Sequence, residues 1–389
     1  MKRKISILGS TGSIGLSTLK IIDKKKSFFK PYIFSANKNF KLIKKQIFKY
    51  KPTYFIINDE NTYIKVSKYF KKNKIKILKN LDELKIKRTK NITVSAIPGI
   101  AGLRPTLQSI KFSSKVLLAN KEAIICGWDL ILRESKKHKT KLIPVDSEHY
   151  SVLKLLENQD FDEIKKIYLT ASGGPFLNYK PSKLKKVKAS HALKHPKWKM
   201  GKKISIDSAT LMNKIFEVIE AQKIFNLSNN KIDIVIHPNS LVHAILVLKN
   251  GIKKFIYHET SMIIPLANAI FDGKIDINQF HEIRNLPELE NLLFKKVNKK
   301  IFPAIKLKDR MNRHPSSPII INAANEVLVD LFLKKKVGFL DMNKTIMAIF
   351  KDSNFKKYAV KKPKNISQIY LIDFWARKLT MKKLKIKHA

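Results

Sequence analysis

The chain of 389 residues contains a single cysteine, Cys126, so no disulfide can form within it. That usage is typical of proteins from a reducing compartment. Long apolar runs are also missing, because none approaches the roughly 18 residues that a membrane-spanning helix requires. The basic start Met1–Lys4 resembles a signal peptide, but the apolar stretch behind it, Ile5–Leu8, is too short and leads into glycines. We therefore expect a cytoplasmic protein without a membrane partner.

Acidic residues are scarce, with 30 Asp and Glu against 79 Lys and Arg, which gives a formal net charge of +49. A charge of this size suggests a non-enzymatic protein that binds nucleic acid or an anionic membrane. Arginine, however, supplies only eight of the basic residues, although it is the residue suited to bidentate phosphate and base contacts. The lysines are spread along the whole chain, among many residues with A/T-rich codons. We interpret the charge as compositional drift and expect no specific nucleic-acid partner.

Length and composition predict two or three domains that each bury a core, since 44% of the residues are apolar. In residues 1–146, short apolar strands alternate with helical patterns, which predicts an α/β fold with a Rossmann-like, doubly wound sheet. The expected strands are Ile5–Leu8, Tyr32–Ser35, Tyr54–Ile57, Val94–Ile97, Val116–Leu118 and Leu142–Val145.

The pattern changes after residue 146. Residues 147–271 predict a central α+β catalytic domain, in which an antiparallel sheet flanks a long helix at 209–225. Its expected strands are Ile164–Leu169, Ile232–Ile236, Ala244–Leu248 and Lys254–Tyr257. Residues 272–297 are predicted to be a linker, and residues 298–389 a C-terminal helical bundle. The expected helices of the bundle are Ile319–Lys334, Asp341–Lys351 and Ser367–Thr380, the last with Ser367 as N-cap.

Glycine is scarce, with 12 in the chain, yet three stand together at Gly9, Gly12 and Gly15, directly after the first expected strand. Glycines let the backbone approach a pyrophosphate, and the helix that follows offers N–H donors at its positive end. The spacing is G-x-x-G-x-x-G. The alternative interpretation of these glycines is an ordinary glycine-rich turn. The placement favours a dinucleotide site.

The second expected strand ends at Ser35-Ala36-Asn37-Lys38-Asn39, where an NAD enzyme usually carries an acid for the ribose. Here no acid is present, and a lysine suits a 2′-phosphate, so NADPH is the expected cofactor. The alternative is that Lys38 is simply one more solvated lysine.

Asn120-Lys121-Glu122 follows another strand, at the carboxyl edge where open parallel sheets bind ligands. Its plain alternative makes Asn120 a helix cap and Glu122 a favourable first-turn charge.

Three carboxylates indicate a metal site. Asp146 and Glu148 stand two apart at an expected strand end, so they should share a face. Glu217 lies on the expected helix, where Asn213, Glu217 and Glu220 form one polar stripe between apolar residues. Oxygen ligands without cysteine suit Mg²⁺ or Mn²⁺. The alternative to a metal site is that the acidic residues of this stripe form salt bridges with lysines.

Seven motifs in order resemble the 1-deoxy-D-xylulose 5-phosphate reductoisomerase family over essentially the whole chain. They stand at residues 9–15, 117–122, 144–149, 172–176, 195–201, 207–214 and 322–326. The resemblance implies an NADP-dependent oxidoreductase that rearranges and reduces 1-deoxy-D-xylulose 5-phosphate to 2-C-methyl-D-erythritol 4-phosphate in non-mevalonate isoprenoid biosynthesis. It further implies a homodimer that needs a divalent metal.

The resemblance also implies the roles of individual residues. Asp146, Glu148 and Glu217 would bind the metal ion and act in catalysis together with Lys121. The substrate residues would be Ser147, Glu148, Ser172, His195, Ser208, Asn213, Lys214 and Glu217. The cofactor residues would be Thr11, Gly12, Ser13, Ile14, Asn37, Lys38, Asn39, Asn120, Lys121, Glu122 and Gly201. Trp198 and Met200 would belong to a lid, and Met262 would lie near the nicotinamide. The residues are compatible with a retroaldol route and with a 1,2-shift.

Two positions depart from the family pattern. Asn37 replaces a common glycine, and we expect the turn to survive because Asn tolerates left-handed backbone. Pro98 replaces a common valine and removes a backbone donor, which we expect to be tolerated.

An aspartate-semialdehyde-type dehydrogenase is the alternative enzyme, because it shares a similar glycine-rich motif near its N-terminus. It needs a nucleophilic cysteine, however, and Cys126 lies in a helix-like run.

Overall fold

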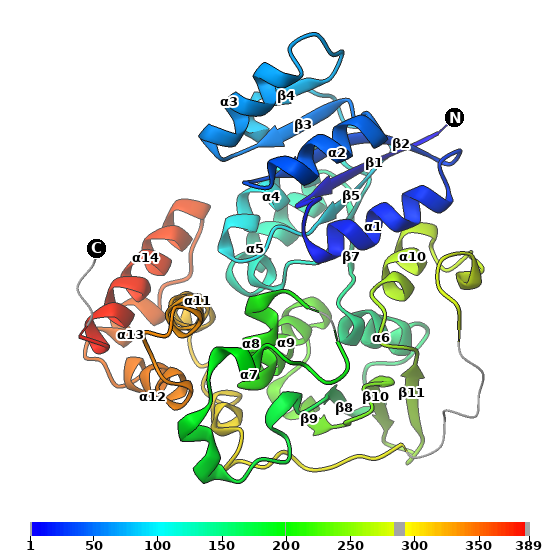
Figure 1. Cartoon of the computed structure of the whole chain (residues 1–389). Helices are drawn as coiled ribbons and strands as arrows, with labels where there is room; N and C mark the ends of the chain where they lie inside the picture. Colours follow the sequence, from blue (N-terminus) through cyan, green and yellow to red (C-terminus); the bar gives the residue numbers. More distant parts are fainter. Residues whose placement is uncertain (1, 199, 284–291, 386–389) are drawn as a thin grey trace. The chain divides into compact units, whose positions relative to one another are not determined.

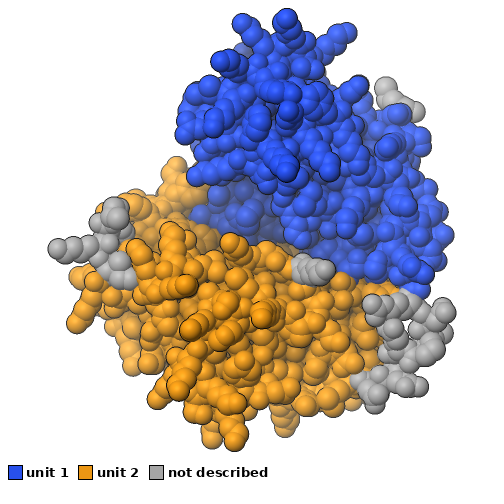
Figure 2. Space-filling model, in the orientation of Figure 1, with its two compact units in different colours: residues 1–123, 129–150, 261–284 blue, residues 124–128, 151–260, 285–389 orange. Residues whose placement is uncertain are grey.

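The computed structural model describes residues 2–198, 200–283 and 292–385 (Figure 1). The chain divides into two compact units, which Figure 2 colours separately. Unit 1 comprises residues 1–123, 129–150 and 261–284, and unit 2 comprises residues 124–128, 151–260 and 285–389. No helix among the described residues is both long enough and apolar enough to span a membrane.

Unit 1 contains a sheet of seven parallel strands in the order β4-β3-β2-β1-β5-β6-β7. The strands are β1 Arg3–Leu8, β2 Phe29–Ala36, β3 Tyr54–Ile57, β4 Lys76–Leu78, β5 Asn91–Ser95, β6 Lys115–Leu118 and β7 Lys141–Pro144. The strand order reverses at β1, which confirms the predicted doubly wound sheet. The sequence analysis missed β4, because this short edge strand has no fully buried residue.

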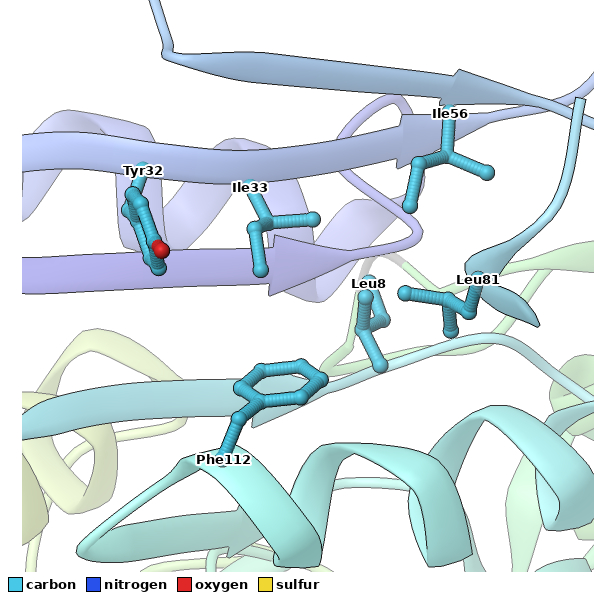
Figure 3. Close-up of a cluster of buried hydrophobic side chains, with 6 residues drawn as sticks. All are labelled: Leu8, Tyr32, Ile33, Ile56, Leu81 and Phe112. Carbon is cyan, nitrogen blue, oxygen red and sulfur yellow. The ribbon is translucent and has the colours of Figure 1, made fainter. Parts of the chain in front are cut away.

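Helices and short 3-10 turns connect these strands. The helices of unit 1 are α1 Ser13–Lys24, α2 Phe40–Tyr50, α3 Glu60–Tyr69, α4 Leu103–Phe112, α5 Lys121–Lys137 and α10 Ile263–Phe271, with 3-10 turns at Leu81–Glu83, Ile100–Gly102 and Ile277–Gln279. Residues 124–128 of α5 are assigned to unit 2, and the helix departs from helical geometry at Gly127. Figure 3 shows one core cluster, which contains Leu8, Tyr32, Ile33, Ile56, Leu81 and Phe112. These side chains come from three strands, α4 and a 3-10 turn, so the core joins segments far apart in sequence.

Unit 2 contains a sheet of four strands in the order β11-β10-β8-β9. The strands are β8 Ile164–Ala171, β9 Ile232–Ile236, β10 Val242–Leu248 and β11 Lys253–Tyr257. β10 runs antiparallel to β8 and β11, but β8 and β9 run parallel. The prediction of a purely antiparallel sheet was therefore wrong at β9. The physical reason is the long helical connection between β8 and β9, since a crossover of that kind returns the chain in the same direction.

The helices of unit 2 include two that replace one predicted helix. Instead of a single helix at 209–225, α8 spans Lys202–Ala209 and α9 spans Met212–Phe225. Leu211 lies between them with a left-handed backbone, at φ 66°, which no α-helix can contain. The other helices are α6 Ser147–Leu156, which begins in unit 1, α7 Ala189–Ala192, α11 Ser317–Leu333, α12 Phe339–Ile349, α13 Phe355–Ala359 and α14 Ile366–Lys383, with 3-10 turns at Gly174–Phe176, Pro181–Lys186, Asn229–Lys231 and Pro303–Leu307.

The predicted C-terminal helices are confirmed as α11, α12 and α14, but one cap was wrong. Asn365, not Ser367, caps α14, because its side-chain oxygen accepts a hydrogen bond from the Gln368 backbone N–H at 3.0 Å.

The predicted division of the chain into three domains stays a prediction. The two compact units divide the chain differently, since α10, predicted in the central domain, belongs to unit 1. Residues 284–291 of the predicted linker lie outside the described residues.

Candidate active site

The glycine loop after β1 is shaped by close backbone approaches. A Cβ on Gly9, which has φ 90°, would lie 2.7 Å from the Ala96 carbonyl oxygen. A Cβ on Gly15 would lie 2.4 Å from the Gly9 carbonyl oxygen, so only glycine fits at both positions. Gln46 of α2 holds the loop, since its side chain exchanges two hydrogen bonds with Ser10, at 2.6 and 2.9 Å.

The N-terminus of α1 is the position where the sequence predicts the pyrophosphate of a dinucleotide to bind. Gly12 is its N-cap residue, and no side chain caps the helix there. Gly12 and Ser13 are exposed, and Thr11 and Ile14 are half-buried. An exposed helix N-terminus without a side-chain cap presents N–H donors, which fits a pyrophosphate.

The turn after β2 carries the three residues predicted to reach the cofactor ribose, and all three are exposed. Asn39 caps α2 by accepting from the Leu42 N–H at 3.1 Å. Lys38 lies 4.0 Å from an Asp59 oxygen, with 78% of its side chain exposed. Asn37 is not among the residues with positive φ, so the turn forms without the left-handed backbone that we considered for it.

Asn120 is the N-cap of α5, which confirms the alternative interpretation of this residue as a helix cap. Its side-chain oxygen accepts from the Ala123 N–H at 3.0 Å, and its side-chain nitrogen donates to the carbonyls of Ile97 and Gly99. These two carbonyls flank Pro98, and neither bond needs an N–H at that position. Glu122 lies buried in the first turn of α5. Asn120 therefore fixes the loop after β5 to the start of the helix that carries Lys121.

Asp146 and Glu148 are placed by a helix start, not by a strand. β7 ends at Pro144, and Ser147 and Glu148 form the first turn of α6. The strand argument for a shared face was therefore wrong. Instead, the Glu148 N–H donates to an Asp146 carboxylate oxygen at 3.3 Å, as at a helix N-cap, and the Ser147 hydroxyl donates to Glu148 at 2.5 Å.

The surroundings of Asp146 keep it ionised. Burial raises the pKa of its carboxyl, but the Lys121 ammonium and His149 outweigh burial and hold that pKa well below its usual value. The Lys121 ammonium lies 2.9 Å from one Asp146 oxygen, and the His149 imidazole lies 3.5 Å from the other. His149 is thus a neighbour of a predicted metal ligand.

In unit 2, the predicted polar stripe on α9 is formed. Glu217 is 1% exposed and accepts from the Asn213 side chain. The Lys214 ammonium lies 2.5 Å from its other oxygen. A buried carboxylate needs partners of this kind, and both partners are themselves predicted substrate residues.

The loop after β8 brings Ser172 to His195, at 2.9 Å between the hydroxyl oxygen and the ring Nε2. The Gly174 N–H also donates to the Ser172 hydroxyl oxygen, at 3.0 Å. A Cβ on Gly174 would lie 3.2 Å from the Ser208 carbonyl oxygen, so the loop packs closely on the end of α8. Burial lowers the pKa of His195 to about 4. Three residues predicted around the substrate phosphate thus lie in one part of unit 2.

The predicted lid segment leads from His195 to Gly201, the N-cap residue of α8. Trp198 and Met200 are half-buried. The indole of Trp198 packs edge-on against the imidazole of His243, with centroids 6.1 Å apart. Trp198 therefore rests on another aromatic ring and is not a core residue.

Comparison with known proteins decides the family. The 1-deoxy-D-xylulose 5-phosphate reductoisomerase model matches residues 5–127, and models of its C-terminal domains match residues 142–225 and 259–379. The reductoisomerase of Pelagibacter ubique (strain HTCC1062) is 43% identical over 387 residues, covering 97% of this chain and 99% of that protein. The chain belongs to the 1-deoxy-D-xylulose 5-phosphate reductoisomerase family.

Solved reductoisomerase structures agree with this assignment and confirm the fold. One complex with NADPH, fosmidomycin and magnesium matches with a TM-score of 0.91 at 29% identity, covering 98% of both chains. The Zymomonas mobilis reductoisomerase in complex with NADPH matches with a TM-score of 0.87 at 29% identity, covering 99% of this chain and 100% of that chain.

The structure also explains a reductoisomerase motif to which the sequence analysis assigned no role, Asn322–Glu326 of α11. The Asn325 side chain donates to a carboxylate oxygen of Asp207 at 2.7 Å, and both residues are buried. Glu326 accepts from Arg377 of α14. Because Asp207 lies on α8 beside Ser208, the C-terminal helices hold a segment that carries a predicted substrate residue. The two asparagines of this motif inside an apolar helix were the sequence signal for such a polar contact.

Proposed function

We propose that this protein converts 1-deoxy-D-xylulose 5-phosphate to 2-C-methyl-D-erythritol 4-phosphate, with NADPH and a divalent metal ion, in non-mevalonate isoprenoid biosynthesis. The observation that carries this proposal is family membership over nearly the full length of the chain. The predicted site residues support it through their local geometry. The aspartate-semialdehyde dehydrogenase alternative is not favoured, because Cys126 is buried within α5 and 6% exposed.

Asp146, Glu148 and Glu217 would hold the metal ion. Each of them offers one carboxylate oxygen as a possible ligand. The donor set is hard and contains no sulfur, which fits Mg²⁺ and Mn²⁺. Two solved reductoisomerase structures are complexes with magnesium. When bound, the ion supplies Lewis-acid chemistry to the substrate oxygens.

The substrate would be held mainly by its phosphate. Ser172, His195 and Ser208 offer hydroxyl and ring N–H donors, and Asn213 and Lys214 add an amide and a buried ammonium. Lys121 and Ser147 would contact the oxygens of the carbon backbone. Binding energy from the phosphate, which does not react, then orients the carbons that do. These contacts are compatible with both a retroaldol route and a 1,2-shift.

NADPH would bind with its pyrophosphate at the start of α1 and its 2′-phosphate near Lys38. The uncapped helix N-terminus and the absence of an acid after β2 support this placement. The contacting residues would be Thr11, Gly12, Ser13, Ile14, Asn37, Lys38, Asn39, Asn120, Lys121, Glu122 and Gly201. Met262, which precedes α10, would lie near the nicotinamide.

Two further proposals concern assembly and location. The protein would be a homodimer, and support comes from β11, an edge strand of the unit 2 sheet whose Phe255 side chain is 47% exposed. A cytoplasmic location is supported by the absence of a possible disulfide within the chain.

The test is NADPH oxidation with purified protein and 1-deoxy-D-xylulose 5-phosphate. We expect substrate-dependent oxidation that a chelator abolishes and that Mg²⁺ or Mn²⁺ restores. The product should be 2-C-methyl-D-erythritol 4-phosphate by mass spectrometry. Turnover that continues in excess chelator would contradict the metal assignment, and no turnover with either metal would contradict the proposed activity.

A further inference from the structure

The outer side of α14 exposes apolar side chains. Leu371 and Phe374 are 58% and 57% exposed, the highest values among the large apolar residues that the structure describes. They lie one turn apart, on the side of the helix opposite the buried Ile369 and Ala376. α11 and α12 pack against α14, whereas its outer side remains exposed to solvent. A helix that is apolar on two opposite sides is typical of one that is covered on both.

Lysines continue this outer side. Lys378 follows Phe374 by four residues and Lys382 follows by four more, so all three lie along one face of α14. The Lys378 ammonium lies 4.4 Å from the centroid of the Phe374 ring. Residues 353–385 contain nine lysines, all of them exposed, and one acidic residue, the buried Asp373. The apolar side chains therefore stand in a strongly positive surface that no exposed acid of this segment balances.

An aromatic pair borders the same surface. Trp375 of α14 stacks on Tyr358 of α13, with ring centroids 4.1 Å apart, and both residues are half-buried. The Lys361 ammonium lies 5.0 Å from the centroid of the Tyr358 ring, and the neighbouring Val360 is 47% exposed. Half-buried tryptophan and tyrosine are typical of the boundary between hydrocarbon and lipid headgroups. The end of α13 thus repeats the combination of apolar, aromatic and cationic groups that α14 shows.

We propose that this surface binds an anionic lipid bilayer from the side. We call it the α14 face and define it by Val360, Lys361, Leu371, Phe374, Lys378 and Lys382. The apolar side chains insert at the boundary between headgroups and acyl chains, and the ammonium groups at the ends of long stems contact lipid phosphates. Lysine suits this contact, because a headgroup layer has no fixed geometry that would require the fork of arginine. The contact is peripheral and needs no membrane-spanning helix.

Charge complementarity favours this occupant over two others. A second copy of the chain would bring the same positive surface against the first, and the two would repel. A single-stranded nucleic acid would satisfy the lysines, but Leu371 has no aromatic ring on which a base could stack. An anionic bilayer satisfies both the charge and the apolar side chains. This inference goes beyond the proposed activity and does not depend on it.

The test is cosedimentation of the full chain with vesicles. We use vesicles of phosphatidylglycerol and phosphatidylcholine in equal parts, and vesicles of phosphatidylcholine alone. The parent should bind the anionic vesicles at least about tenfold more tightly, because each lysine near an anionic surface contributes about fivefold. Leu371→Ala with Phe374→Ala should weaken this binding about tenfold or more, at low and at high salt, because apolar insertion is not screened.

The lysines of the α14 face are tested by a triple variant, Lys361→Gln, Lys378→Gln and Lys382→Gln. It should weaken binding to the anionic vesicles about tenfold or more at low salt and much less at high salt.

Matched controls carry the same changes elsewhere on the surface. Ile64→Ala with Ile252→Ala alters two apolar residues that are 53% and 54% exposed. A second control replaces three exposed lysines of the α3 region, Lys65, Lys68 and Lys72, by glutamine. Both controls should bind the anionic vesicles within about threefold of the parent, since they leave the α14 face intact. Thermal melts check that every variant is folded.

Three results would overturn the inference. A parent that does not bind the anionic vesicles would show that a bilayer is not the occupant and would leave an acidic protein surface in its place. Equal losses in the control variants and in the variants of the α14 face would show that bulk charge alone attracts the protein. Parental binding after truncation of Leu371 and Phe374 would exclude insertion. Vesicle binding requires no turnover, so a failure here leaves the proposed activity untouched.

Discussion

Glu217 is the predicted metal ligand with the most enclosed carboxylate, being 1% exposed and contacted by Asn213 and Lys214. Glu217→Gln keeps the shape of the side chain but removes the negative charge that a cation requires. We expect turnover to fall at least about a thousandfold, as when a group that stabilises charge in the transition state is lost. Binding of NADPH, measured by fluorescence, should remain near that of the parent because the cofactor residues are unchanged.

The matched control is Glu60→Gln, at a carboxylate that is 60% exposed and paired with Lys79. It should change neither activity nor cofactor binding. Near-normal activity of Glu217→Gln at saturating Mg²⁺ would remove Glu217 from the metal site.

The predicted preference for NADPH can be tested at a single side chain, that of Lys38. It is 78% exposed and lies at the long distance of 4.0 Å from Asp59, so its charge remains available to a ligand. Lys38→Ala should lower kcat/KM for NADPH about tenfold and leave NADH nearly unchanged, because only NADPH carries the 2′-phosphate. Lys41→Ala, at a nearby exposed lysine, is the control. A parent enzyme that uses NADH as well as NADPH would show the assignment to be wrong.

His195 should make stability depend on pH. Its pKa is lowered to about 4 by burial, from an ordinary 6.5. The unfolded chain therefore takes up this proton more readily than the folded protein, and stability is lost as the pH falls from about 6.5 towards 4. Urea unfolding over this range should show a shallower loss in His195→Asn than in the parent. Parallel curves for the two proteins would contradict the lowered pKa.

At the scale of elements, Lys115 ties β6 to the end of α10. Its ammonium contacts the carbonyls of Ala269 and Ile270, at 3.0 and 3.3 Å, and the Asp272 carboxylate, at 2.7 Å. Burial lowers the pKa of Lys115 in spite of the bond to Asp272. A cation at a helix C-terminus also interacts favourably with the helix dipole.

Lys115→Met should lower the free energy of unfolding by about 1–3 kcal/mol, because it leaves buried carbonyls without their donor. Lys141→Met is the matched control, since Lys141 also contacts Asp272 but is 65% exposed. The control should cost less than about 1 kcal/mol, as exposed ion pairs contribute little. Urea denaturation of both variants measures the difference, and equal losses would show that burial of Lys115 has no special effect.

For the whole molecule, the net charge of +49 predicts binding to polyanions without sequence preference. DNA affinity should fall steeply and linearly on a plot of log affinity against log salt, with the same slope for unrelated sequences. Gel-shift or anisotropy titrations at several salt concentrations measure this. Discrimination between sequences at physiological salt would contradict the interpretation of the charge as drift.

The sequence alone determined the elements whose signal is local. The doubly wound sheet followed from apolar strands bounded by turn residues, and β3 and β9 were predicted at their observed bounds. The glycine loop was predictable because close backbone approach excludes any side chain at Gly9 and Gly15. The residues of the candidate site were identified by their ordered motifs, since each motif keeps its functional side chains within a few positions of one another.

Tertiary structure decided what depends on partners distant in sequence. The parallel pairing of β9 with β8 follows from the path of the chain between them, which no strand pattern records. The left-handed residue Leu211 breaks a helix that its apolar neighbours favour, because surrounding packing can impose a backbone that local preference opposes. The contacts of the His195 ring likewise involve a serine in another loop and two backbone N–H groups. The conformational preference of a segment depends on neighbouring residues, whereas hydrogen bonds between residues distant in sequence form only after the chain has packed.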